Sequence, residues 1–230
     1  MLLWHLLKAA AGAGGDIFFA NVVSLLHFDG TDASTTFTDV TGKTWTANGN
    51  AQIDTAQSVS GGASGLFDGT SDWLSTGSSA DFDFGTGDFT IEWRMRLAAI
   101  IGTGGATILA SDAPNRNEPL WIVSGPALRF DSPDGDASSS TLSLSTNTWY
   151  ALAVSRIGNT LYFFLDGVGV GTVDVTGRSF SLNTGSGGTI IGSNSASFGI
   201  NGHLDEWRVT KGVGRYNANY TVASEAFPDS

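Results

Sequence analysis

Residues 88–97 read DFTIEWRMRL and indicate the fold class of this chain. Apolar and polar side chains alternate at every second position, which predicts a long, half-buried β-strand. The apolar side is expected to face a core, while the polar side carries two acids and two arginines. Pairing across neighbouring strands or exposure to solvent is the ordinary explanation for such charges.

Further strands are predicted on both sides of this stretch, about a dozen in all, at a spacing of roughly 8–15 residues. Tight turns are expected at Gly158-Asn159 and at Asp166-Gly167. Another hairpin is predicted between residues 64–67 and 72–76, about a turn at Asp68-Gly69. Helical periodicity is almost absent. The pattern predicts an all-β fold, an antiparallel two-sheet jelly-roll sandwich.

The composition agrees with one all-β domain and disfavours several functions. The chain has 230 residues, with 31 glycines and 5 prolines, as in proteins with many short strands and turns. A formal net charge of −11 makes a nucleic-acid partner unexpected. The absence of cysteine excludes disulfides and Cys-ligated zinc. No apolar run reaches the ~18 residues that a membrane-spanning helix needs.

The two ends of the chain are set apart from a central domain predicted at residues 21–212. Residues 1–20 begin with an apolar segment that includes Leu3, Trp4 and Leu7. We expect an N-terminal arm, with a short helix as one form, docked on this protein or on a neighbour. A signal peptide is the alternative, but its positive charge would precede its apolar core. Residues 213–230 form a tail whose aromatic residues are expected to pack outside the sandwich.

A second informative strand is residues 202–210, GHLDEWRVT, which contains two acids. A carboxylate is a poor strand former, so Asp205 needs a specific reason to lie in a strand. It is expected to be a metal ligand, a catalytic group or an acid that accepts hydrogen bonds from a neighbouring loop. A catalytic pair is disfavoured, because Asp205 and Glu206 are adjacent and a regular strand points them to opposite faces. Asp88 and Glu92 share a face, but two arginines lie on it as well. We therefore expect no enzymatic activity.

Five blocks of sequence, in order, resemble the concanavalin A-like lectin/glucanase superfamily in its laminin-G-like branch. With LLHFDG at 25–30 and TKGVGRY at 210–216, the chain is most similar to laminin-G-like domains of tailed-phage virion proteins. The resemblance covers roughly residues 22–211. It implies a jelly roll of about twelve to fourteen strands, often with a structural calcium, used mainly for binding. The blocks are LFDG and DWL within 66–74, GDFTIEW at 87–93, WYALAVSR at 149–156, LYFFLDG at 161–167, and IG at 191–192 followed by NGHLDEWR at 201–208.

The resemblance implies a calcium site where the first and last strands meet. Asp205 matches the last strand, Asp29 matches the end of the first strand, and Asp39 follows in the next loop. Calcium prefers several oxygen ligands from carboxylates and carbonyl groups. The alternative is that these acids accept hydrogen bonds from loop backbone, since buried carboxylates need such partners with or without a metal.

A glycan site is a third candidate, because sugars stack on exposed aromatic rings and are oriented by amide groups. Trp73 and Trp121 lie near predicted loops, and Asn115 can supply an amide. Trp45 is a further aromatic candidate. The alternative is that these tryptophans pack inside the sandwich, as large aromatic residues usually do.

These observations lead to one favoured function and two alternatives. The favoured function is a non-enzymatic component of a phage virion, either a head decoration or a tail or fibre protein, attached through its N-terminal arm. Its partners are then other virion proteins or further copies of itself, after synthesis in the reducing host cytoplasm. The first alternative is a carbohydrate-binding module for host surface glycans, and the second is a glycoside hydrolase.

Overall fold

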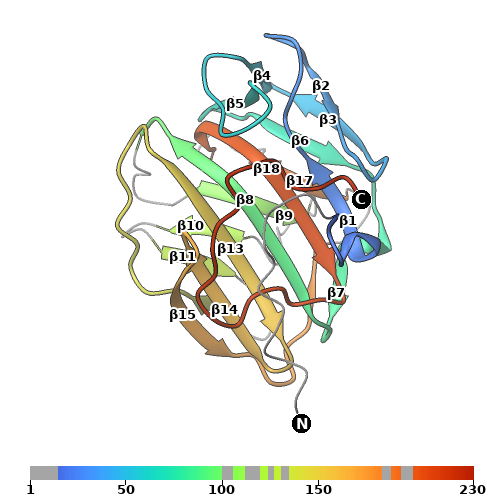
Figure 1. Ribbon diagram of the computed structural model, residues 1–230, viewed down its shortest axis with the longest axis vertical. Coiled ribbons are helices and arrows are strands. Elements are labelled where there is room, and N and C mark those ends of the chain that lie inside the picture. The colour runs from blue at the N-terminus through green and yellow to red at the C-terminus, as the bar shows by residue number, and fades with distance from the viewer. Residues whose placement is uncertain are drawn as a thin grey trace.

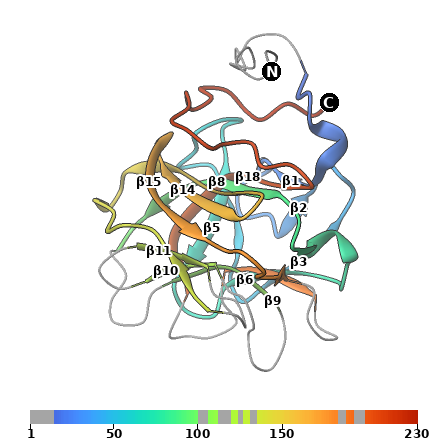
Figure 2. The ribbon, with the colours of Figure 1, turned by 90° about the horizontal axis from the view of Figure 1, so that it is seen from below.

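A computed structural model describes residues 15–99, 106–111, 120–123, 127–130, 135–182, 188–192 and 199–230. The described chain forms two large antiparallel sheets that pack face to face (Figures 1 and 2). The predicted all-β sandwich is therefore confirmed. The arm residues Leu3, Trp4 and Leu7 lie outside the described residues.

The front sheet in Figure 1 has the strand order β15-β14-β13-β8-β18-β5-β4, and β1 also pairs with β18. The long strands β8, β13 and β18 form its centre. The bounds of its strands are β1 (Val22–Leu26), β4 (Gln52–Asp54), β5 (Ser64–Asp68), β8 (Phe89–Leu97), β13 (Trp149–Ile157), β14 (Thr160–Leu165), β15 (Val168–Asp174) and β18 (Asn201–Lys211).

The back sheet has the order β12-β11-β10-β9-β17-β6-β3-β2, and a small third sheet pairs β16 with β7. The described residues hold 18 strands. This exceeds the number that the resemblance implies, because several strands have only two or three residues. The remaining bounds are β2 (Thr36–Thr38), β3 (Thr44–Asn48), β6 (Trp73–Thr76), β7 (Asp83–Gly85), β9 (Ala106–Ser111), β10 (Leu120–Val123), β11 (Ala127–Phe130), β12 (Ala137–Ser138), β16 (Phe180–Ser181), β17 (Thr189–Gly192), and the 3-10 turns η1 (Phe19–Asn21) and η2 (Ala80–Phe82).

The core lies between the two sheets, and β8 shows how the sequence builds it. Its apolar residues at every second position are buried in one continuous cluster, as the alternation predicts. Phe89 stacks on Phe84 with ring centroids 4.5 Å apart and meets Phe180 edge-on at 5.8 Å. Each such ring contributes roughly 1.5–3 kcal/mol through burial alone.

Two of the three predicted turns are confirmed, and one hairpin is wrong. β13 pairs with β14 across Gly158, and β14 pairs with β15 across Gly167, where positive φ values of 58° and 75° suit glycine. By contrast, β5 pairs within the front sheet and β6 within the back sheet. The buried Asp72 accepts hydrogen bonds from the backbone of Asp68 and Asn50, so the turn carries the chain from one sheet to the other.

Both ends of the described chain lie on the outer face of the front sheet. Figure 2 shows the tail, residues 213–230, as a separate layer outside this sheet. The backbone N–H of Asp16 donates to the carbonyl of Ser230 at 2.7 Å, which joins the two ends. Within the described residues, no helix is long and apolar enough to span a membrane.

Candidate functional site

Strand β18 carries a β-bulge at its two acids. Its pairing with β8 shifts in register between Asp205 and Arg208, and Glu206 has a positive φ of 48°. Leu204 and Trp207 both lie in the core cluster, so the bulge places the two residues between them on the outer face. The expectation that Asp205 and Glu206 point to opposite faces is therefore wrong, because it assumed an unbroken strand.

Asp205 is held by the loop between β4 and β5. Its carboxylate accepts hydrogen bonds from the backbone N–H groups of Val59 at 2.7 Å, Ser60 at 3.3 Å and Glu206 at 2.8 Å. Asp205 is fully buried, and burial together with the charge of Glu206 raises its pKa to about 7. These contacts match the alternative in which a loop satisfies the acid.

The other two acids predicted as calcium ligands also have protein donors. Asp39 accepts hydrogen bonds from the side chains of Ser24 at 2.6 Å and Trp45 at 2.9 Å. Asp29 is exposed and accepts a hydrogen bond from the backbone of Ala63. Among the described residues, no three acids or histidines gather in a way that could hold a metal ion. The geometry favours hydrogen-bonded carboxylates over calcium ligands at these positions.

Four successive rows of outward side chains cross β13, β8 and β18, and the tail covers three of them. The tail runs upward across these strands in Figure 1. Backbone groups of Arg215 and Tyr216 bond to the lowest row, and the carbonyl of Ala223 accepts a hydrogen bond from Arg94 at 2.5 Å. From the lower end upward, the rows are Ser155–Thr90–Thr210, Ala153–Glu92–Arg208, Ala151–Arg94–Asp205 and Trp149–Arg96–His203.

A buried ion network fastens the tail to the covered rows. Glu92 accepts hydrogen bonds from Arg208 at 2.8 and 3.0 Å, and from the Tyr216 hydroxyl at 2.8 Å. Asp16 accepts from Arg208 at 3.0 Å and from Arg215 at 2.6 and 2.9 Å. Burial alone would raise the pKa of Asp16, but the two arginines hold it below its usual value. Glu92 is therefore a structural counter-ion with both carboxylate oxygens engaged.

Glu206 is held in a similar way by β1 and by the tail. It accepts hydrogen bonds from Nδ1 of His27 at 2.8 Å and from the backbone N–H of Phe227 at 2.6 Å. Nε2 of His27 lies 2.7 Å from a carboxylate oxygen of Asp229. The hydrogen bond to Glu206 is the main cause that raises the pKa of His27 to about 9, against the opposing effect of burial. The charged imidazolium thus links β1, β18 and the tail.

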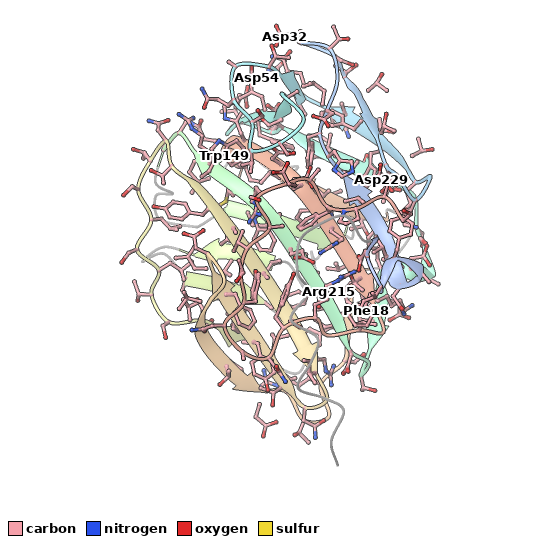
Figure 3. All side chains as sticks on the ribbon, viewed as in Figure 1. Phe18, Asp32, Asp54, Trp149, Arg215 and Asp229 are labelled. Carbon is pink, nitrogen blue, oxygen red and sulfur yellow. The ribbon has the colours of Figure 1, made fainter. Side chains whose placement is uncertain are left out.

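The fourth row lies beyond the tail, in the upper part of Figure 3, where Trp149 and Asp54 are labelled. Cross-strand pairing extends this row over five strands of the front sheet. Its side chains face outward, because their neighbours along each strand, such as Met95 and Leu204, lie in the core. We call it the Trp149 row, and its members are Trp149 on β13, Arg96 on β8, His203 on β18, Leu66 on β5 and Gln52 on β4.

Two polar groups of the Trp149 row, Nδ1 of His203 and the Arg96 guanidinium, have no partner among the described residues. Nε2 of His203 lies 2.8 Å from Asp54, but its buried Nδ1 has no hydrogen-bond partner. No hydrogen bond or ion pair joins the Arg96 side chain to the described part of the chain. The rings of Trp149 and His203 lie 6.3 Å apart, and Trp149 is partly exposed. The row therefore combines an aromatic face with unpaired polar atoms, as ligand sites do.

The structure does not bring the predicted glycan residues together. Trp73 is partly exposed on the outer face of the back sheet, because the next residue, Leu74, lies in the core. The backbone of Trp121 lies in β10, but its side chain, like all of Asn115, lies outside the described residues. Trp45 is only 5% exposed and packs against Phe82, as the core alternative predicts.

A shallow open hollow of about 470 Å³ lies on the hairpin of β2 and β3. Exposed threonines line it, including Thr36 and Thr46, which are paired across the two strands. Its aromatic residues, Phe37 and Trp45, are each 5% exposed. They offer no free ring face for a sugar, so the hollow is a weaker candidate than the Trp149 row.

Sequence reasoning missed the Trp149 row, although one signal was available. In residues 149–156, WYALAVSR, the apolar Leu152 and Val154 mark the buried face. Period two then places Trp149 on the opposite face, where a large aromatic side chain is unexpected unless something covers or binds it. The partners on β8 and β18 depend on register, which no local pattern gives.

A family model described as the Concanavalin A-like lectin/glucanases superfamily matches residues 67–213 of the chain. A search of curated protein sequences found no match. The match begins within β5 and ends just after β18, so it includes Trp149, Arg96 and His203 of the Trp149 row but not Leu66 or Gln52.

Several solved structures share the fold at low sequence identity. Domain 4 of AbnA, a GH43 extracellular arabinanase from Geobacillus stearothermophilus solved with arabinotriose, has a TM-score of 0.63 and 17% identity, covering 84% of this chain and 94% of that one. The binding domain of Paraclostridial Mosquitocidal Protein 1 has a TM-score of 0.63 and 14% identity, covering 90% and 51%. A structure of botulinum neurotoxin type C, whose cell entry depends on two ganglioside molecules, has a TM-score of 0.59 and 15% identity, covering 85% and 49%. The chain thus spans about half of each toxin structure.

Proposed function

Because this chain belongs to the concanavalin A-like lectin/glucanases superfamily, we propose that it is a non-enzymatic binding domain for saccharides. The observation that carries the proposal is the Trp149 row, where a partly exposed indole lies beside Arg96, a partly exposed cation with no partner in the described part of the chain. An indole can stack on the apolar face of a sugar ring while neighbouring polar groups bond its hydroxyls. The arabinanase domain solved with arabinotriose supports the proposal by fold likeness.

The state of the carboxylates supports a binding role over hydrolysis. A glycosidase needs one acid free to donate a proton and a second carboxylate to attack or to activate water. Glu92 is bound to Arg208 and Tyr216, and Glu206 to His27 and the tail backbone. Asp205 is fully buried on loop backbone. An activity screen on the saccharides that bind tests the hydrolase alternative, and turnover abolished by Glu92→Gln would contradict the proposal.

The experiment that tests saccharide binding is a glycan array with the purified full chain and two matched variants. We expect the wild type to bind a defined set of glycans and Trp149→Ala to lose them. Trp73→Ala is the control, because Trp73 is a partly exposed tryptophan on the other sheet. Silence of the wild type across the array, or loss of binding in Trp73→Ala alone, would overturn the proposal.

We also propose a setting for this domain, the virion of a tailed phage, where it binds other virion proteins. The support is the resemblance of residues 25–30 and 210–216 to laminin-G-like virion proteins. Removal of residues 1–15 keeps Asp16 and its two arginine partners, so the domain should fold. We expect the truncated chain to bind saccharides as before and to be absent from purified particles. Normal incorporation would refute the role of the arm.

A further inference from the structure

We infer that the Trp149 row selects saccharides that carry a carboxylate, such as uronic or sialic acids. This inference rests on the proposed function and specifies the ligand class of the same site. It follows from the charges on the row rather than from its aromatic ring.

Arg96 is a cation without an anion. It is partly buried between its cross-strand neighbours Trp149 and His203, and it bonds to nothing in the described part of the chain. The nearby acid, Asp54, is engaged by His203 at 2.8 Å. A guanidinium that is partly removed from water gains most from a planar, bidentate anion, and a carboxylate has that shape.

Two other buried arginines on the same face are paired with acids. Arg208 and Arg215 share the carboxylate of Asp16, and Arg208 also binds Glu92. In a chain with a net charge of −11, acids are plentiful, yet no acid in the described part of the chain pairs with Arg96. Arg94, two residues away on the same face, donates to a tail carbonyl and keeps a buried Nε without a partner. Within the described residues, neither guanidinium at this end of the sheet is paired with a carboxylate.

The row is long enough for several sugar residues. It crosses five strands, and neighbouring strands lie about 4.8 Å apart, which gives a length of roughly 19 Å. Leu66 and Gln52 continue it beyond His203 and are partly exposed. A free inorganic anion would use Arg96 alone, whereas an acidic oligosaccharide uses the indole, the guanidinium and the far end together.

The experiment is calorimetric titration of the full chain with matched pairs of oligosaccharides. The probes are trigalacturonate with its methyl ester, and sialyllactose with lactose. We expect at least one acidic probe to bind about tenfold or more tightly than its neutral partner, because hydrogen bonds to a charged group are the stronger kind. Arg96→Met should remove that preference, because it lowers the affinity for the acidic probe far more than the affinity for its neutral partner, and Arg96→Lys should fall between.

The outcomes separate the two proposals. Equal affinity for acidic and neutral partners, with Trp149→Ala abolishing both, would overturn the carboxylate preference and leave saccharide binding intact. An acid preference that survives Arg96→Met would show that another site makes the selection. If no saccharide bound on the array or in these titrations, the proposed function itself would fail. Binding of free acetate or phosphate as tight as that of the sugar acids would also overturn the inference.

Discussion

On the outer face of the front sheet, an arginine under the tail and an arginine beyond it differ in their partners. Under the tail, Arg208 is 5% exposed, donates to two carboxylates and lies 3.8 Å above the ring of Phe227. Two rows higher, on the neighbouring strand, Arg96 is partly exposed and has no partner in the described chain. The same strands thus carry the ion pairs that hold the tail and, where the tail does not cover them, a partly exposed surface.

This difference distinguishes the residues that hold the tail on the sheet from the residues of the candidate site. Arg208 and Arg215, which help to hold the tail, are paired with acids, because an unpaired buried charge is costly. Under the proposal, the Arg96 guanidinium is left unpaired for a ligand, and the chain tolerates it because the row is partly open to water. The two parts therefore predict opposite results when the same substitution is made in each.

The largest effect is expected from Arg208→Met. The substitution leaves Glu92 buried without its main counter-ion and weakens the hold on Asp16, which costs about 3–5 kcal/mol of the free energy of unfolding. Urea denaturation of the purified variants measures it. Arg96→Met is the matched control, expected within about 0.5 kcal/mol of the wild type, as for other substitutions outside the core. Equal destabilisation of the two variants would contradict the claim that Arg208 stabilises the fold and Arg96 does not.

The next effect is a pH-dependent one at His27. Its pKa of about 9 in the folded state exceeds the ordinary value of 6.5, so its contribution to stability is fully present below pH 6.5 and is lost as pH rises through about 9. We expect His27→Gln to be about 3 kcal/mol less stable than the wild type at pH 6. The gap, measured by urea denaturation, should shrink towards zero by about pH 10. A gap independent of pH would mean that His27 is neutral when folded.

A smaller effect is expected at the outer end of the same contact. The side chain of Asp229 is 66% exposed, so water screens its pair with His27. Asp229→Asn should lower the free energy of unfolding by less than about 1 kcal/mol. Thermal unfolding of this variant beside His27→Gln shows whether Glu206 or Asp229 dominates. A larger loss for Asp229→Asn would place the main partner at the exposed end.

The smallest effect is expected from calcium. A calcium site would add about 2.7 kcal/mol to the free energy of unfolding at a free calcium concentration of about 100 times its Kd. Because protein donors already engage Asp205 and Asp39, we expect calcium or EGTA to move the melting temperature by less than about 1 °C, against several degrees for real binding. A calcium-induced rise that Asp205→Asn abolishes would restore the predicted ligand.

The alternation in residues 88–97, together with about a dozen further strand signals and almost no helical periodicity, predicted the fold class, because period two follows directly from strand geometry. The bulge at Glu206 was not predictable, since a positive φ at glutamate leaves no local signal. The false hairpin has a similar cause: a turn motif shows that the chain reverses, not which sheet the next strand joins. The Trp149 row depends on the register between strands far apart in sequence. The sequence could therefore predict only that Trp149 lies on the outer face, and not which residues lie beside it.

The most direct test of the account is where a bound saccharide lies. The indole N–H signals of the 7 tryptophans can be followed by NMR during titration with a glycan identified on the array, and assigned with single Trp→Phe variants. The account predicts the largest shift for Trp149, with Trp73 unmoved. A shift confined to Trp73, or to tryptophans other than Trp149, would contradict it.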